Sequence, residues 1–311
     1  MMLSIVTTMY YSAPYLDAFY RRSCAVAEQL TSDIEFIFVN DGSPDEALQH
    51  ALSLHRNDHR VKVIDLSRNF GHHKAMMTGL RHSQGDLVFL IDCDLEVAPE
   101  TLLDFYQKRT ESNADVVFGV QDNRHDAFAN KLFANAFYIV FNWLSDTKIP
   151  TNVTTARLMT RRYVSALVAH QEREIMIAGL WAITGFKQES MPVTKAAKGS
   201  STYNLTRKIA ILITSVTAFS NRPLILVFYL GSIISLLSGL SALYIIVRII
   251  FFGTFLAGWP SVIVSIWFLG GLIIQCIGII GIYLSKVFTE TKQRPYTIIR
   301  EIYDRSKSND L

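Results

Sequence analysis

The sequence is poor in charged residues and in cysteine, and both shortages narrow the class of protein. Only 18% of the 311 residues are charged while 50% are hydrophobic, which is apolar for a chain that is soluble throughout. The net charge of +3 is too small to indicate a nucleic-acid partner, although it suits an anionic membrane surface. The three scattered cysteines, Cys24, Cys93 and Cys276, fit neither a zinc site nor a disulfide framework. They favour a reducing cytoplasm.

The hydrophobic residues are concentrated after Arg222. Residues 223–247 and 261–285 form two runs without any charge. At about 1.5 Å of rise per helical residue, each run is long enough to cross the roughly 30 Å hydrocarbon core. Lys and Arg flank the outer ends of the pair, so the positive-inside rule places both termini in the cytoplasm. We therefore expect a two-helix transmembrane domain over 222–287, in a multi-pass protein of the cytoplasmic membrane.

The segments on either side of the two runs have a different character. Apolar and polar residues alternate with helical spacing over 204–221, which predicts an amphipathic juxtamembrane helix at the lipid interface. The same periodicity also fits a core helix of the soluble domain, and both readings stay open. Residues 288–311 are predicted to form a cytoplasmic tail.

The first part of the chain alternates short apolar runs with helical patterns. Apolar, β-branched segments predict five strands, at 3–9, 34–40, 61–66, 87–92 and 115–120. Helical patterns lie between them, and such alternation is typical of a mostly parallel sheet that helices cover on both faces. We assign residues 1–203 to this α/β domain.

Polar residues follow the strands at positions that would share one edge of such a sheet. Asp41 follows the second strand and Arg68 the third, while Asp92, Asp94 and Glu96 follow the fourth. Ligands of open α/β sheets bind beyond the carboxyl ends of the strands. Three carboxylates at one strand end are costly unless a cation joins them, and a divalent cation that carries a phosphate meets this need.

These motifs resemble the membrane-anchored family 2 glycosyltransferases that load sugars onto polyprenyl phosphate, such as bactoprenol glucosyltransferases and dolichol-phosphate mannose synthases. The resemblance covers nearly the whole chain. Its motifs, in order, are VNDGS at 39–43, LSRNFG at 66–71, DCDL at 92–95, Pro99-Glu100, RLM at 157–159, the Gly199–Tyr203 loop, Arg222-Pro223 and Arg294-Pro295. It implies a Rossmann-like GT-A domain, a nucleotide-sugar donor and a divalent metal, Mg²⁺ or Mn²⁺.

The resemblance also implies roles for individual residues. As catalytic residues it implies Asp94, Arg157 and Lys198. As nucleotide-sugar-binding residues it implies Thr8, Asp41, Arg68, Asp92, Ser201 and Tyr203. As phosphate or acceptor contacts it implies Arg124, Lys131 and Lys195. As metal ligands it implies Asp92, Asp94 and Glu96.

Three departures from the family pattern concern the acceptor side and the metal. Thr155 stands where relatives have an Asp that has been assigned an acid/base or acceptor role, and threonine cannot act as a carboxylate base. Glu96 replaces a typical Gln and is a good ligand for hard cations. His72 and His73 replace a Lys and an acid, and either histidine would supply a base if the acceptor needed one.

We expect the chain to transfer a sugar from a nucleotide sugar to a polyprenyl phosphate of the undecaprenyl type at the cytoplasmic membrane face, for assembly or modification of cell-surface glycans. Two alternatives stay open: transfer to a lipid-linked sugar or glycan, and a non-catalytic nucleotide-sugar-binding scaffold. The Gln-x-x-Arg-Trp signature of processive polysaccharide synthases is missing. Whether the chain forms a homo-oligomer is also left open.

Overall fold

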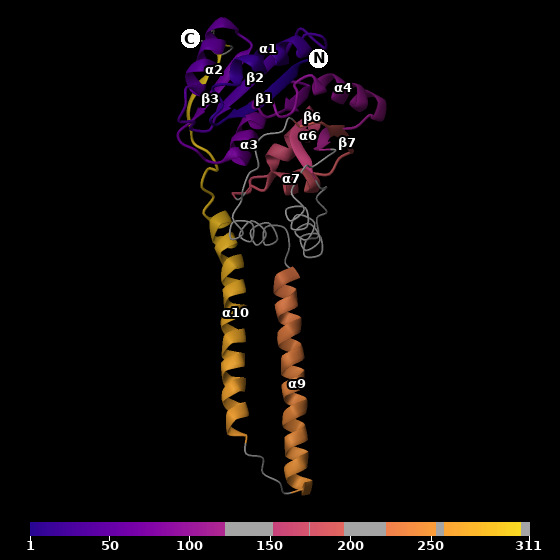
Figure 1. Ribbon diagram of the computed structural model, residues 1–311, viewed down its shortest axis with the longest axis vertical. Helices are drawn as coiled ribbons and strands as arrows, with labels where there is room; N and C mark the ends of the chain where they lie inside the picture. The colour runs from indigo at the N-terminus through magenta and orange to yellow at the C-terminus, as the bar shows by residue number, and fades with distance from the viewer. Residues whose placement is uncertain (122–151, 174, 196–221, 253–257, 306–311) are drawn as a thin grey trace. The chain divides into compact units, whose positions relative to one another are not determined.

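The computed structural model describes residues 1–121, 152–173, 175–195, 222–252 and 258–305 (Figure 1). These residues fall into two compact units. One contains the described residues up to 195 together with those from 294 onward, and the other contains those of 222–293.

The first unit is built on one sheet of eight strands. In chain order the strands are β1 (Leu3–Met9), β2 (Ile34–Asn40), β3 (Val61–Leu66), β4 (Leu87–Leu90), β5 (Val116–Gln121), β6 (Val153–Thr160), β7 (Gln188–Val193) and β8 (Ile299–Tyr303). In space their order is β7-β5-β6-β4-β1-β2-β3-β8. The central strands β4, β1, β2 and β3 are parallel, as are β5 and β7, whereas β6 and β8 run antiparallel to their neighbours. The predicted α/β fold with a mostly parallel sheet is confirmed.

Helices cover both faces of the sheet, and each face has its own core. Helices α1 (Leu16–Ala27), α2 (Ala47–Asn57) and α4 (Thr101–Ser112) share one core. Helices α3 (His72–His82), α6 (Arg161–Ala169) and α7 (Ile177–Ile183) share the other. Successive strand residues alternate between the two cores, as Phe36 and Ile37 do on β2. Both faces are therefore apolar, which explains the continuous hydrophobic runs of the central strands.

The strand directions bring the polar motifs to one edge. Because β4, β1, β2 and β3 are parallel, the residues that follow them share the carboxyl edge of the sheet. Strand β6 runs the opposite way and pairs Arg157 with Leu90 of β4. Its first residues, including Thr155, therefore lie at the same edge as the acidic residues that follow β4.

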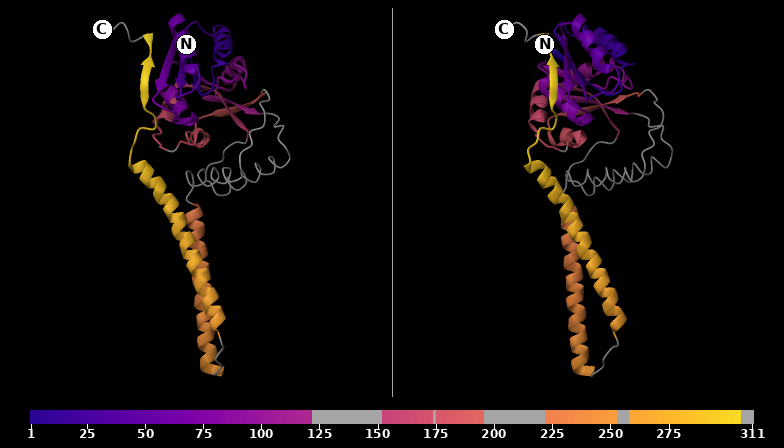
Figure 2. Two further views of the ribbon diagram at one scale, coloured as in Figure 1. Left: turned by 60° about the vertical axis from the view of Figure 1, so that its left-hand side comes forward. Right: turned by 90° about the vertical axis from the view of Figure 1, so that its left-hand side faces the viewer.

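The sheet ends on a strand from the far end of the chain. β8 pairs antiparallel with β3, and the views in Figure 2 show this yellow strand beside the sheet. The tail predicted over 288–311 therefore contains the last residues of helix α10 (Trp259–Thr291) and a strand of the first unit. The apolar residues of this segment are Ile299, Ile302 and Tyr303, and charged residues separate the first from the other two. The segment therefore lacks the regular alternation of apolar and polar residues that identifies a strand.

The second unit contains two long helices, α9 (Arg222–Phe252) and α10. The helical part of the prediction is confirmed. In the part of the chain that the structure describes, one stretch, Ser265–Thr291 of α10, is long and apolar enough to cross a membrane, and α9 contributes the shorter apolar stretch Arg222–Ile234. The two helices by themselves therefore do not establish that the chain crosses the membrane twice. The predicted juxtamembrane helix over 204–221 lies outside the described residues.

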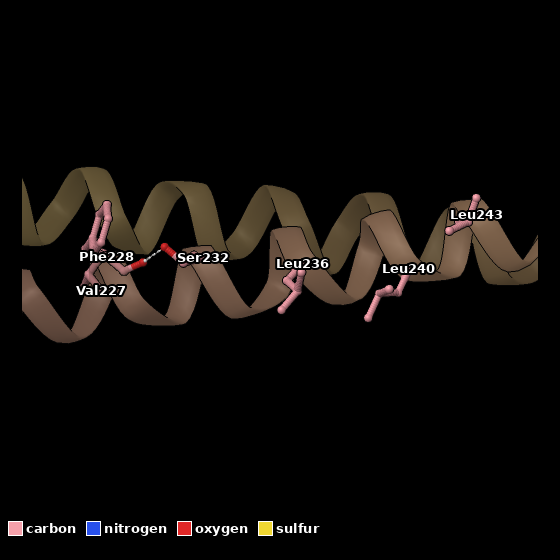
Figure 3. A pocket seen from close by; sticks show the side chains of 7 residues that line it. Val227, Phe228, Ser232, Leu236, Leu240 and Leu243 are labelled. Carbon is pink, nitrogen blue, oxygen red and sulfur yellow. Dashed lines mark hydrogen bonds between the residues drawn. The ribbon is translucent and has the colours of Figure 1, made fainter.

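A groove runs along α9 in this unit (Figure 3). Its lining is apolar except at Ser232, whose hydroxyl donates to the backbone carbonyl of Phe228 at 2.8 Å. A groove with this lining offers no groups for polar chemistry. The polar motifs that follow the strands lie in the first unit.

Candidate functional site at the carboxyl edge of the sheet

Asp92, which follows β4, lies at the centre of a polar cluster. The Nε2 atom of His72 lies 3.2 Å from its Oδ1 atom, and the side chain of Thr155 lies near enough to favour the charged form of the carboxylate. Burial raises the pKa of Asp92, but the hydrogen bond and charge of His72, followed by Thr155 and the charge of Lys195, outweigh it and lower the pKa below its ordinary value. Asp92 is therefore an anion at neutral pH, and strands β4 and β6 and helix α3 together hold it in place.

His72 connects this carboxylate to strand β1. Its Nδ1 atom lies 2.9 Å from the hydroxyl of Thr8, a buried residue near the end of β1. The two ring nitrogens of His72 thus contact one residue each, Thr8 through Nδ1 and Asp92 through Nε2. Two residues predicted separately, Thr8 and Asp92, are thus joined through His72.

The acidic loop continues through a strained residue. Leu95 has a φ of 61°, a conformation that side chains other than glycine rarely adopt. The carboxylate of Asp94 accepts a hydrogen bond from the Glu96 amide at 3.1 Å, across this residue. Glu96 in turn forms an ion pair with Lys195, at 3.0 Å between Oε2 and Nζ.

Across the described ranges, no three side chains of His, Cys, Asp or Glu gather into a group that would hold a metal ion by itself. Of the three predicted ligands, Asp92 contacts His72 and Glu96 contacts Lys195. Two carboxylates at this edge nevertheless suit a hard cation that takes its remaining oxygens from a bound diphosphate, because Mg²⁺ is commonly held by one or two carboxylates together with substrate phosphates. The residues present therefore fit a metal that arrives with its ligand.

Asp41 ties the ends of β2 and β3 together. Its two carboxylate oxygens accept the backbone N–H groups of Phe70 and Gly71 at 2.7 and 3.0 Å. The side chain is buried, and burial raises the pKa of this carboxyl although both N–H donors oppose the rise. Arg68 lies in the same loop, with its guanidinium 4.1 Å from the centre of the Phe70 ring. The predicted contact of Asp41 with a nucleotide base stays a prediction, while its role in shaping the loop is visible.

Arg157 lies in the core behind the acidic cluster, with only 1% of its surface exposed. Its guanidinium stacks on the Trp181 ring, 2.9 Å from the ring centre, and donates to the carbonyls of Thr154 and Thr155. Burial lowers the pKa of Arg157 to about 9. In this position Arg157 supports the start of β6, which carries Thr155.

Comparison with known proteins gives this edge its chemical context. The sequence model of the family described as "Glycosyl transferase family 2" matches residues 4–167, which is more than half of the chain. The chain belongs to glycosyl transferase family 2. The match begins in β1 and includes the acidic loop after β4, the whole of β6 and most of α6.

Relatives of this family 2 glycosyltransferase match it along most of their length. A Mycobacterium tuberculosis protein that is named as a glycosyltransferase is 57% identical over 303 residues, which cover 97% of this chain and 89% of the relative. The glycosyltransferase sll0501 of Synechocystis is 33% identical, with 97% and 95% covered. The prophage bactoprenol glucosyl transferase homolog of Escherichia coli is 30% identical, with 97% and 99% covered.

The glycosyltransferase brings together only part of the predicted site. Of the predicted residues, Thr8 and Asp92 both contact His72, and Lys195 pairs with Glu96. Thr155, which was not predicted as a site residue, lies beside Asp92. Five further predicted residues lie outside the described residues: Arg124, Lys131, Lys198, Ser201 and Tyr203. The contact of Thr155 with Asp92 was not foreseen, because the antiparallel insertion of β6 beside β4 leaves no local signal in the sequence.

Proposed function

We propose that this glycosyltransferase moves a sugar from a nucleotide-sugar donor to a polyprenyl phosphate carrier at a membrane. The cluster of Asp92 and Asp94 after β4 supports the donor side, because ligands of α/β sheets bind at this edge. Full-length similarity to relatives named bactoprenol glucosyl transferase supports a lipid carrier as acceptor. The position of the acidic pair at the strand ends is the single observation that carries the proposal.

On the donor side, Asp92 and Asp94 would hold a Mg²⁺ or Mn²⁺ ion together with the diphosphate of the donor. When bound, such an ion supplies charge neutralisation for the departing nucleoside diphosphate. His72 and Thr155 hold the Asp92 carboxylate in one position, and the strained loop at Leu95 presents Asp94. Lys195 contributes a positive charge at the same place. These groups bind and orient the diphosphate end of the donor.

On the acceptor side, the phosphate of the carrier would be the nucleophile. Its oxygen attacks the anomeric carbon, the bond from that carbon to the diphosphate oxygen breaks, and the nucleoside diphosphate leaves. A phosphate monoester is already anionic at neutral pH, with a second pKa of about 6, so it needs no carboxylate base. This chemistry is compatible with Thr155 in place of the family Asp. A sugar hydroxyl as acceptor would require a base.

For localisation, we propose that α9 and α10 both cross the membrane, with the sheet domain on the cytoplasmic side. The one stretch that is long enough by itself, Ser265–Thr291, supports a membrane anchor. The uncharged run over 223–247 supports a second span. The cations that flank the pair support the cytoplasmic side.

Transfer to a short polyprenyl phosphate tests the proposal. Full-length protein is incubated with Mg²⁺, the lipid and each of a panel of labelled nucleotide sugars, and the lipid phase is extracted. We expect one donor to label the lipid in a product that mild acid cleaves, as a sugar phosphodiester should. An acid-stable product would indicate a glycan acceptor instead. Nucleoside diphosphate binding without any transfer would favour the scaffold.

A further inference from the structure

The C-terminal strand β8 carries an arginine at an irregular position. Asp65 of β3 pairs with Glu301, but the next residue, Leu66, pairs with Ile299, so Arg300 is an extra residue in β8. An extra residue of this kind is a β-bulge, and bulges re-aim side chains beside functional sites. Here the bulge directs Arg300 toward the carboxyl end of β3.

Arg300 makes two contacts there. One guanidinium nitrogen, Nη1, donates to the Asp65 carboxylate at 3.0 Å, and Nη2 donates to the carbonyl of Ser67 at 2.8 Å. Asp65 is 1% exposed, so its charge needs partners. Among the described residues, the other side chain that donates to it is the amide of Asn40, at 2.7 Å. Arg300 therefore fixes a buried carboxylate and a loop carbonyl at once.

Both contacts lead to the loops that hold Asp41. Asn40, which donates to Asp65, precedes Asp41 and accepts the Ser43 amide at 3.1 Å. Ser67, whose carbonyl Arg300 holds, precedes the loop whose amides bond Asp41. The amide of Ser67 also donates to Ile298 at 2.9 Å, just before β8. Arg300 thus links β8 to both loops, and the backbone bond between Ser67 and Ile298 links the second loop to β8 separately.

We propose that Arg300 is a positioning residue for the nucleotide end of the donor site. It acts through Asp65 and Ser67 and sets how the loops at 40–43 and 67–71 face the donor. The inference rests on the proposed donor site at this edge. The inference adds that β8, which follows the two apolar helices in the sequence, is needed for nucleotide affinity. No sequence motif near Asp41 indicates this need.

The test compares full-length R300M, R300K and R305M in lipid nanodiscs. Arg305 is a matched control, because it lies just after β8 and donates to the backbone carbonyl of Arg56 at 3.0 Å, at the end of α2. Binding of UDP and of GDP with Mg²⁺ is measured by calorimetry. Hydrogen exchange is followed in a peptide that contains the Phe70 and Gly71 amides.

We expect R300M to weaken binding of the preferred nucleotide by about three- to tenfold, since part of a charge-assisted hydrogen bond is lost from the loop. Exchange at Phe70 and Gly71 should quicken in R300M and stay unchanged in R305M. R300K should lie between R300M and the wild type, because one ammonium cannot reproduce the planar fork. Wild-type affinity and exchange in both Arg300 variants would overturn the inference. A wild type that binds neither nucleotide would instead overturn the donor site itself.

Discussion

Replacing Gly42 with alanine should displace the loops at 40–43 and 67–71, where we propose that the donor binds. Gly42 has a φ of +61°, and a Cβ there would lie 2.5 Å from the Asn69 nitrogen and 2.6 Å from the Arg68 carbonyl carbon. Both are backbone atoms, so the loop at 67–71 has to move by about 1 Å to reach ordinary contact distance. The left-handed conformation alone costs alanine about 1–2 kcal/mol.

The displacement should reach function through Asp41. Its bonds to Phe70 and Gly71, at 2.7 and 3.0 Å, cannot both survive a shift of that size. A misplacement of about 1 Å can reduce turnover roughly a hundredfold, so we expect kcat/KM for the donor to fall by about ten- to a hundredfold in G42A. Steady-state kinetics with varied donor measures the loss, and thermal unfolding measures the stability.

Gly185 offers the matched control. Its φ of +74° imposes the same strain on alanine, but a Cβ there meets nothing within 4 Å. G185A should lose only the conformational cost and keep the wild-type donor kinetics. If G42A and G185A lose equal stability and G42A keeps the wild-type donor KM, the collision between the two loops has no consequence and the reasoning is refuted.

Three other predictions concern single groups. D94N should abolish sugar transfer without lowering the melting temperature, and wild-type turnover with an unchanged Mg²⁺ or Mn²⁺ dependence would contradict the proposed metal ligand. Arg60 and Tyr20, acting against burial, lower the pKa of Asp58 from 3.8 to about 2, so the carboxylate stabilises the fold above pH 4. D58N should therefore lose about 2 kcal/mol at pH 7, and this difference should vanish as the pH falls to 2, which denaturant unfolding at several pH values checks. Burial raises the pKa of Cys93 to about 11, so iodoacetamide should not modify this thiol in the folded protein at pH 7.5, and rapid labelling would disprove its burial.

The central strands were predictable because their signal is local. β1, β2 and β3 coincide with the apolar runs at 3–9, 34–40 and 61–66, since both faces of these strands are buried. Strand β4 ends at Leu90, two residues earlier than predicted. Strands β6, β7 and β8 were not predicted as strands of the sheet, because their pairing depends on contacts between distant parts of the chain.

The residues of the site were also predictable only where their signal is local. Strand ends placed Asp41 and Asp92 at one edge, because a parallel sheet brings such residues together. The partners of these acids did not follow from the sequence: that Thr155 would contact Asp92 depends on the register of β6, and that Glu96 would pair with Lys195 depends on β7. Threonine at 155 looked like a missing acid, whereas in the fold its side chain lies beside Asp92 and favours the charged form of that acid.

The position of β8 also constrains the order in which this protein can mature. Strand β3 leaves the ribosome long before β8, with both apolar helices synthesised between them. Until β8 arrives, β3 is an uncovered edge with free backbone donors and acceptors, and such edges promote misassembly. The sheet can therefore be completed only after α9 and α10 have been made. A chain cut before Arg294 keeps every acidic residue of the site but lacks the strand that closes the edge.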